Sequence, residues 1–171
     1  MEITNKLYND LIKLCNENDY TEEEIDLINK AYNYALKQHK DMLRKNGEPY
    51  IVHPLSVAII VADLNTDYQT VVAALVHETI MHGTSNIDEL RKLFGDDVAS
   101  IVDSLDKINK LHLTDDSESS SLYQRKVLVA LSQDVRVIIL KLAGRVHNMR
   151  TIDGLPKDLQ KNKAKETAGL K

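Results

Sequence analysis

Apolar residues recur at three- and four-residue steps along nearly the whole chain. In TEEEIDLINKAYNYALKQHK (21–40), this spacing follows a capping box, in which Thr21 stands three residues before Glu24. The stretch from 96 to 108 repeats the spacing with five apolar positions. A period near 3.6 residues places such side chains on one face of a helix. The sequence therefore predicts an all-α fold, a bundle of helices around a shared core.

Breaks in the pattern predict where the helices end. Pro54 suits the first turn of a helix that runs to about 64, Asp67 caps a helix to about 82, and Gly83 ends it. VRVIIL (135–140) is rich in β-branched residues and could form a strand, but the pattern continues through LAGRVHNMR and favours a helix. The further segments are a short helix from 85 to 95, a helix from 96, an acidic Ser-rich loop at 114–121, and helices at about 122–132 and 134–151.

Composition narrows the class of protein. The 171 residues suit one domain, and a net charge of −4 gives no basic footprint for nucleic acid. The single Cys15 excludes an internal disulfide. No segment resembles a secretory signal, and the apolar stretches are too short to span a membrane. We expect a cytoplasmic domain that contacts neither membrane nor nucleic acid. The polar tail at 156–171 ends without a stop signal, which suggests a piece of a longer chain.

AALVHETIMHGT (73–84) places a His-Glu pair and a second histidine in an apolar helix. Glu78, Met81 and His82 share one face of that helix, and His77 lies at its edge. Another histidine, His53, directly precedes Pro54. Imidazole and carboxylate suit Mn²⁺, Fe²⁺ or Zn²⁺, but spacing alone does not bring His53 to His77. The cluster could be a working metal site, a damaged one, or a helix surface that carries two histidines.

Four stretches resemble the N-terminal HD domain of the RelA/SpoT-homologue (Rel/Spo) family. They are RKNGEPYIVHP (44–54), the apolar run that ends at His77, FGDDVASIVDSLDKI (94–108) and LAGRVHNMRT (142–151). The resemblance covers about residues 25 to 170. These enzymes make and hydrolyse the alarmone (p)ppGpp in the stringent response. The resemblance implies an HD-domain helical bundle over 1–171, with a core at about 25–155 and a connector from 156 toward a synthetase domain.

In members that hydrolyse (p)ppGpp, the resemblance implies a Mn²⁺ ion held by two histidines and two aspartates. His53 and His77 match the histidines, whereas Glu78 and Gly144 stand where the aspartates should be. Gly144 has no side chain to ligate a metal, and the extra methylene of Glu78 displaces its oxygens. Position 144 is therefore expected to decide metal binding, because Glu78 could still serve in part. We expect vestigial metal positions at His53, His77 and Glu78, with no tightly bound cofactor, or Mn²⁺ if the site is residually functional.

Family members also use a Glu-Asp pair to activate water, and here Met81 and His82 stand at those positions. Methionine can neither accept a proton nor orient a water molecule, so no catalytic pair is intact. The residues matched to nucleotide binding keep the family's types: Arg44, Lys45, Asn148 and Thr151.

Each of these residues also has a simpler interpretation. His77 could be a buried, hydrogen-bonded histidine, and His82 a surface residue near a helix end, where a cation suits the dipole. His147 is expected to pack or to donate a hydrogen bond rather than to ligate a metal. Arg44 and Lys45 could form a solvated turn.

The residues and the Rel/Spo resemblance together imply a hydrolysis-inactive HD domain within a longer chain. That chain would be a (p)ppGpp synthetase (GTP pyrophosphokinase), and the HD domain would regulate its downstream synthetase domain. One alternative is a residual Mn²⁺-dependent (p)ppGpp 3′-pyrophosphohydrolase. The other is a sensor that binds a guanine nucleotide such as ppGpp or GTP without turning it over.

Overall fold

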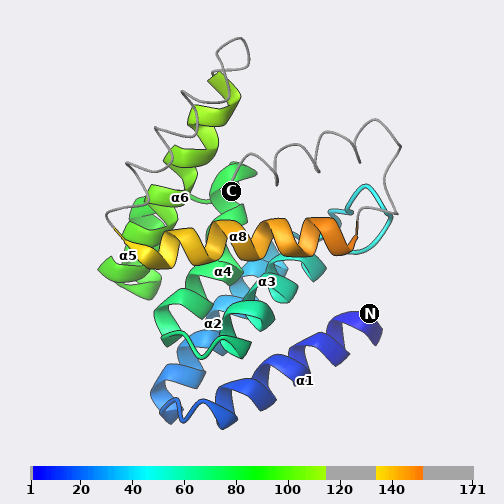
Figure 1. Ribbon diagram of the computed structural model, residues 1–171, viewed down its shortest axis with the longest axis vertical. Coiled ribbons are helices and arrows are strands. Elements are labelled where there is room, and N and C mark those ends of the chain that lie inside the picture. The colour runs from blue at the N-terminus through cyan, green and yellow to red at the C-terminus, as the bar shows by residue number, and fades with distance from the viewer. Residues whose placement is uncertain (1, 115–133, 152–171) are drawn as a thin grey trace.

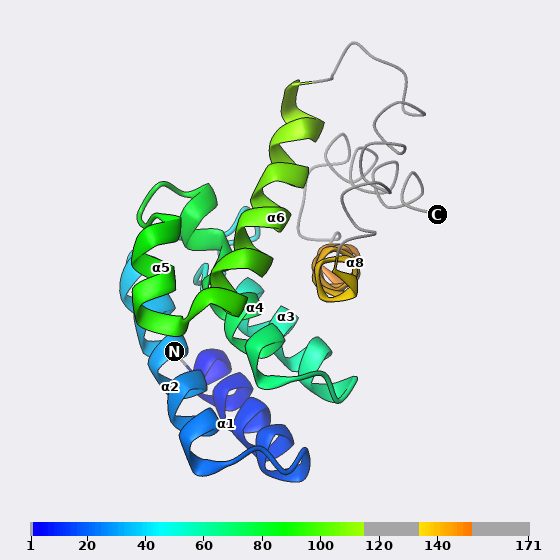
Figure 2. The ribbon, with the colours of Figure 1, turned by 90° about the vertical axis from the view of Figure 1, so that its left-hand side faces the viewer.

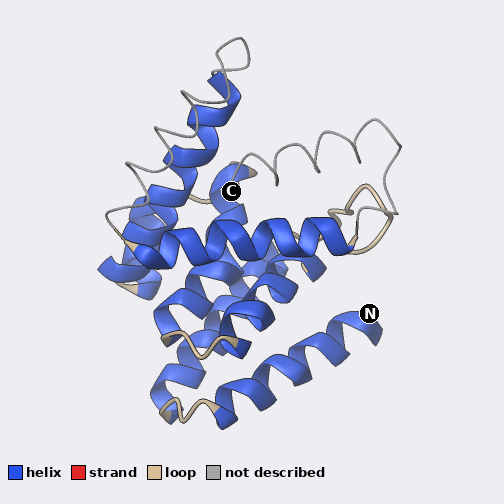
Figure 3. Ribbon diagram, in the orientation of Figure 1, coloured by secondary structure: helices blue, strands red, loops and turns tan. Residues whose placement is uncertain are grey.

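The computed structural model describes residues 2–114 and 134–151, and every regular element in these ranges is a helix (Figure 3). This confirms the all-α prediction. The helices are α1 (Glu2–Glu17), α2 (Glu22–Gln38), α3 (Val52–Asp63), α4 (Tyr68–Met81), α5 (Ile87–Phe94), α6 (Asp96–Thr114) and α8 (Val135–Arg150). The predicted helix at 122–132 and the tail at 156–171 lie outside the described residues, as does the predicted loop apart from Thr114. The domain bounds stay a prediction.

The predicted helix ends are confirmed at several positions. Thr21 and Glu24 form the reciprocal capping box, with bonds of 2.9 and 3.1 Å. The Asp67 carboxylate caps α4 by accepting the Thr70 backbone N–H at 2.9 Å. Gly83 follows the end of α4 with a φ of +73°, a left-handed conformation that glycine adopts without steric cost. The cap of α5 is Asn86 rather than Ser85, one residue later than expected.

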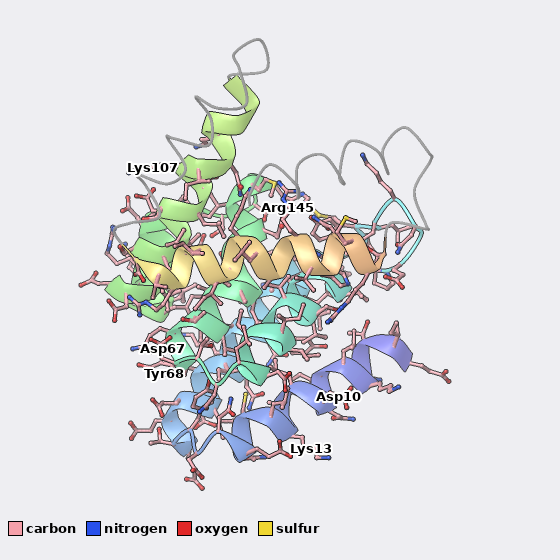
Figure 4. The ribbon with its side chains drawn as sticks, viewed as in Figure 1. Asp10, Lys13, Asp67, Tyr68, Lys107 and Arg145 are labelled. Carbon is pink, nitrogen blue, oxygen red and sulfur yellow. The ribbon has the colours of Figure 1, made fainter. Side chains whose placement is uncertain are left out.

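Helix α1 was not anticipated from the sequence pattern. It packs along α3, below the rest of the bundle in Figure 1. Leu11 and Cys15 are fully buried in this contact, whereas Asp10 and Lys13 lie on its exposed side (Figure 4). The hydrophobic core therefore begins before residue 25.

Helices α3 and α4 form the centre of the bundle. They pack against each other, and α4 also contacts α2 and α6. Both are apolar on most of their surface, as expected for helices that neighbours cover on several sides. Consequently, a polar side chain near the end of α4 projects into the protein and requires internal partners.

Helix α8 crosses the bundle over α3 and α6, and it is seen end-on in Figure 2. The segment 135–140 is helical, so the strand alternative for it is wrong. Val137 and Leu140 face the core and are almost fully buried. Helical packing onto α3 and α6 therefore outweighs the local preference of β-branched residues for strands.

Arg136 anchors the N-terminal end of α8. Its guanidinium lies 3.2 Å from Asp67, 2.9 Å from Asp134 and 3.8 Å from Asp97. These carboxylates stand at the starts of α4, α8 and α6. The anchor sets the direction in which α8 carries residues 144–151 toward the opposite end of the molecule. Among the described residues, no helix is both long and apolar enough to cross a membrane.

The packing of α1 makes a prediction about Cys15. Burial raises the pKa of its thiol to about 11, and the thiolate is the reactive form. We expect no reaction with a disulfide reagent at about pH 8 in the native protein, and stoichiometric reaction in guanidinium. Absorbance of the released thiolate measures both. Rapid native labelling would contradict stable docking of α1.

Candidate functional site

Two helices, α3 and α4, bring the predicted metal positions His53, His77 and Glu78 together. His53 lies in the first turn of α3, and His77 and Glu78 lie near the end of α4. The Nε2 atoms of His53 and His77 are 3.5 and 3.3 Å from the same carboxylate oxygen, Oε1 of Glu78. The structure thus places both histidines around a carboxylate.

The Glu78 carboxylate is buried, with 5% of the residue exposed. Its second oxygen, Oε2, accepts a hydrogen bond from the Tyr50 hydroxyl at 3.1 Å and lies 3.8 Å from Nε2 of His82. Burial alone would raise the pKa of this carboxyl group. The contacts with His53 and His77 outweigh burial and hold the pKa of Glu78 well below its usual value. Glu78 is therefore ionised.

His77 faces acceptors on both sides of its ring. Nδ1 lies 2.9 Å from the Ala74 carbonyl oxygen, which can only accept, and Nε2 faces the Glu78 carboxylate. Burial pulls the pKa of His77 down, but Glu78 and the backbone carbonyls outweigh it and raise the pKa. Both acceptors therefore favour the protonated imidazole of His77 beside the Glu78 carboxylate.

His53 is linked to α8 through His147. The two Nδ1 atoms are 2.7 Å apart, so one ring donates and the other accepts. Burial lowers the pKa of His53 and lowers that of His147 to about 3, so both rings are neutral. His147 acts here as a hydrogen-bonding partner, in agreement with the prediction made for it.

The side chains do not fit the metal centre that the Rel/Spo resemblance implies. Of the four positions that would ligate the ion, only His53, His77 and Glu78 carry a side chain that can bind it, and these three lie together. Gly144 supplies no ligand, although a Cβ there would meet no atom within 4 Å. Within residues 2–114 and 134–151, no group of three or more His, Cys, Asp or Glu side chains is arranged to hold a metal ion.

Neither residue at the water-activating positions replaces the family's carboxylate pair. Met81 is about half exposed and carries only a thioether. His82 caps the end of α4 and turns its Nε2 toward Glu78. This position agrees with the prediction that His82 is a surface residue near a helix end. Its contact with Glu78 was not predicted.

Three of the four predicted nucleotide positions meet beside this cluster. Nη2 of Arg44 lies 3.4 Å from Oδ1 of Asn148 and 3.3 Å from Oγ1 of Thr151. These contacts join the loop before α3 to the C-terminal end of α8. Lys45 is exposed next to Arg44. Gly47, with a φ of +89°, provides the turn that folds this loop back on itself.

Several buried polar atoms around the loop lack a hydrogen-bond partner. They include Nη1 of Arg44 and Oε2 of Glu48, which lie 3.9 Å apart. Both ring nitrogens of His39 also lack one, and its ring packs beside Tyr50 and His82 at centroid distances of 5.1 and 5.3 Å. Burial, together with the nearby His82, lowers the pKa of His39 to about 4. Nη1 of Arg44 is thus a buried donor whose charge partner, Glu48, lies beyond hydrogen-bond distance, and an anionic ligand can accept from such a donor.

Sequence reasoning missed the roles of Tyr50 and His39 at the site. The sequence motifs assigned Tyr50 no contact at the site, yet its hydroxyl donates to the Glu78 carboxylate. The YIVHP motif contains the available signal, because it places Tyr50 three residues before His53.

A family model described as HD domain matches residues 31–170 of the chain. The chain belongs to the HD-domain family. It is 43% identical over 159 residues to a GTP pyrophosphokinase of Myxococcus xanthus, covering 88% of this chain and 20% of that protein. It is 40% identical over 146 residues to the bifunctional (p)ppGpp synthase/hydrolase SpoT of Escherichia coli, covering 85% of this chain and 21% of that protein.

The fold is shared with a metazoan ortholog of SpoT that hydrolyses ppGpp. The TM-score is 0.66 at 22% sequence identity, over 88% of this chain and 85% of the other. The Myxococcus xanthus and Escherichia coli relatives confirm the Rel/Spo resemblance of this HD domain. The chain spans about a fifth of the length of the curated relatives described here.

The Tyr50–Glu78 bond can be tested by Tyr50→Phe. Hydrogen bonds to charged groups contribute about 1.5–3 kcal/mol, against about 0.5–1.5 for neutral pairs. We expect Tyr50→Phe to lower the free energy of unfolding in urea more than Tyr34→Phe, whose hydroxyl pairs with neutral Ser85 at 2.5 Å. Equal losses of unfolding free energy in the two variants would show that the Tyr50 hydroxyl does not stabilise the Glu78 carboxylate.

Proposed function

We propose that this chain is a hydrolysis-inactive HD domain of a Rel/Spo protein and that it regulates a synthetase domain. The observation that supports this most directly is that Gly144, which completes the ligand set with His53, His77 and Glu78, has no side chain to bind a metal. In the relatives that hydrolyse (p)ppGpp, the resemblance implies a metal ion at this place. Here the two histidines meet an anion of the protein itself.

Loss of the water-activating pair supports the same proposal. General acid-base groups contribute about 10²–10⁴-fold to a rate, and position 81 carries a half-exposed methionine. At position 82, a histidine stands in place of the family's aspartate, and its Nε2 faces the Glu78 carboxylate at 3.8 Å. The residual hydrolase alternative would need both another metal ligand in place of Gly144 and another base.

Similarity to GTP pyrophosphokinases over a fifth of their length supports a partner in the same polypeptide. On this proposal the parent chain makes (p)ppGpp in the cytoplasm, and the present domain affects that activity through a domain contact. Regulation by a non-hydrolysing domain is then its contribution to alarmone metabolism.

The guanine-nucleotide sensor is a second candidate, and a specific observation favours it. Arg44 contacts Asn148 and Thr151 through Nη2 and leaves the buried Nη1 without a hydrogen-bond partner. A phosphate oxygen would pair with that donor. Nucleotide binding and regulation are compatible, because a bound alarmone could report its own concentration to the synthetase.

The hydrolysis proposal is tested with ppGpp and Mn²⁺. We expect no pyrophosphate release by the wild type, because neither a metal centre nor a water-activating pair is present. The variant with Glu78→Asp, Met81→Glu, His82→Asp and Gly144→Asp restores the family's residues and should release pyrophosphate in a Mn²⁺-dependent way. Turnover by the wild type at a comparable rate would refute the proposal.

Nucleotide binding is tested by calorimetric titration of ppGpp. Arg44→Ala should weaken binding by about 10–100-fold, because a charge-assisted contact contributes about 1.5–3 kcal/mol. Lys13→Ala is the matched control, since it removes the same charge from the exposed side of α1. Equal affinity of the Arg44 variant and the control would contradict the assignment, and absence of any binding by the wild type would exclude the sensor.

A further inference from the structure

We propose that Glu78 is an internal ligand that takes the place of the metal ion, joining α3 and α4 through its carboxylate without any metal. This deepens the proposed function and rests on it in one respect, namely that the HD site of this chain works without a metal centre. It also changes which position decides metal binding. The sequence points to Gly144, whereas the geometry points to Glu78.

Four side chains from different segments surround the Glu78 carboxylate. Oε1 lies 3.5 Å from His53 on α3 and 3.3 Å from His77 on α4. Oε2 accepts from Tyr50 in the loop before α3 at 3.1 Å and lies 3.8 Å from His82 at the end of α4. A metal ion would join the same two helices through the same histidines. Glu78 thus supplies, through its carboxylate, a contact between α3 and α4 that does not require a cation.

Side-chain length explains why glutamate can do this. Compared with aspartate, Glu78 carries one additional carbon–carbon bond, which extends its oxygens by up to about 1.5 Å. The added reach brings Oε1 within 3.5 Å of both Nε2 atoms. A buried anion is stable only where donors surround it, and 5% exposure leaves Glu78 dependent on these side chains.

The hydrogen positions on the histidines also suit a carboxylate and oppose a metal. Nε2 of His53 faces an anion, so it must carry the hydrogen, and Nδ1 then accepts from Nδ1–H of His147. Metal binding needs the lone pair of Nε2 instead, with the hydrogen on Nδ1. A metal could enter only if the carboxylate withdrew and both rings exchanged their tautomers.

The first experiment compares Mn²⁺ affinity of the wild type, Gly144→Asp and the double variant Glu78→Asp with Gly144→Asp, by calorimetry and metal analysis. Space around Gly144 accommodates the new side chain. We expect the wild type and the single variant to bind no Mn²⁺ at micromolar concentrations, and the double variant to bind at least about 100-fold more tightly than the single one. Binding by Gly144→Asp alone that equals the double variant would overturn the proposal.

The second experiment measures thermal unfolding with EDTA or Mn²⁺. Glu78→Gln keeps the length of the side chain but removes its charge, and it should lower the Tm by about 10 °C, whereas the control Glu23→Gln, exposed on α2, should not. Neither additive should change the Tm of the wild type. The double variant should have a lower Tm than the wild type in EDTA and should regain the wild-type Tm with Mn²⁺. This comparison tests the role of Glu78 even if the Glu78→Gln variant does not fold. A Glu78→Gln variant with the Tm of the wild type would refute the proposal.

The third readout is the tautomer of His53, observed by ¹⁵N NMR of the histidine rings. We expect the hydrogen on Nε2 in the wild type and on Nδ1 in the zinc-loaded double variant. A wild-type His53 with its hydrogen on Nδ1 would contradict the role assigned to Glu78.

Failure of this inference differs from failure of the proposed function. Mn²⁺-dependent release of pyrophosphate by the wild type would refute the function. A wild type that neither binds Mn²⁺ nor hydrolyses ppGpp, but whose Tm does not depend on Glu78, would refute only the role of its carboxylate.

Discussion

A buried carboxylate must be surrounded by hydrogen-bond donors, and the arrangement of the site follows from this requirement at Glu78. The end of α4 is enclosed by α3 and the loop before it, so the anion cannot reach solvent. Tyr50, His53 and His77 satisfy it from three directions. His53 in turn makes α8 part of the network through His147. One side chain thereby links the loop, two central helices and the helix that crosses them.

Much of the fold was predictable because its signals are local. Capping residues such as Thr21 and Asp67 hydrogen-bond within their own turn, so their roles can be read from a few neighbouring letters. Helix α1 was not predicted, although Leu7, Leu11 and Leu14 recur at helical spacing in this segment. For the segment 135–140, propensity allowed a strand, and packing against distant helices decided for a helix.

The candidate site was predictable in its residues but not in its chemistry. Matching to the family's motifs grouped His53, His77 and Glu78, and the structure places these side chains next to one another, whereas helical spacing alone did not bring His53 to His77. The motif matching treated Glu78 as an imperfect ligand, since a sequence does not show where the oxygens of a longer side chain end. The partners of that carboxylate, Tyr50 and His82, come from separate segments, and only the three-dimensional arrangement shows that they converge on it.

The two ends of α8 are held by different kinds of interaction, and dissolved ions act on them unequally. At the N-terminal end, Arg136 meets carboxylates that are partly exposed, including Asp67 at 43% and Asp97 at 63%. Counterions screen such pairs strongly. At the other end, the neutral His53–His147 pair is buried, and Arg44 contacts neutral oxygens. Rising ionic strength therefore weakens the ion pairs at the first turn of α8 and leaves the contacts of its last turn largely unchanged.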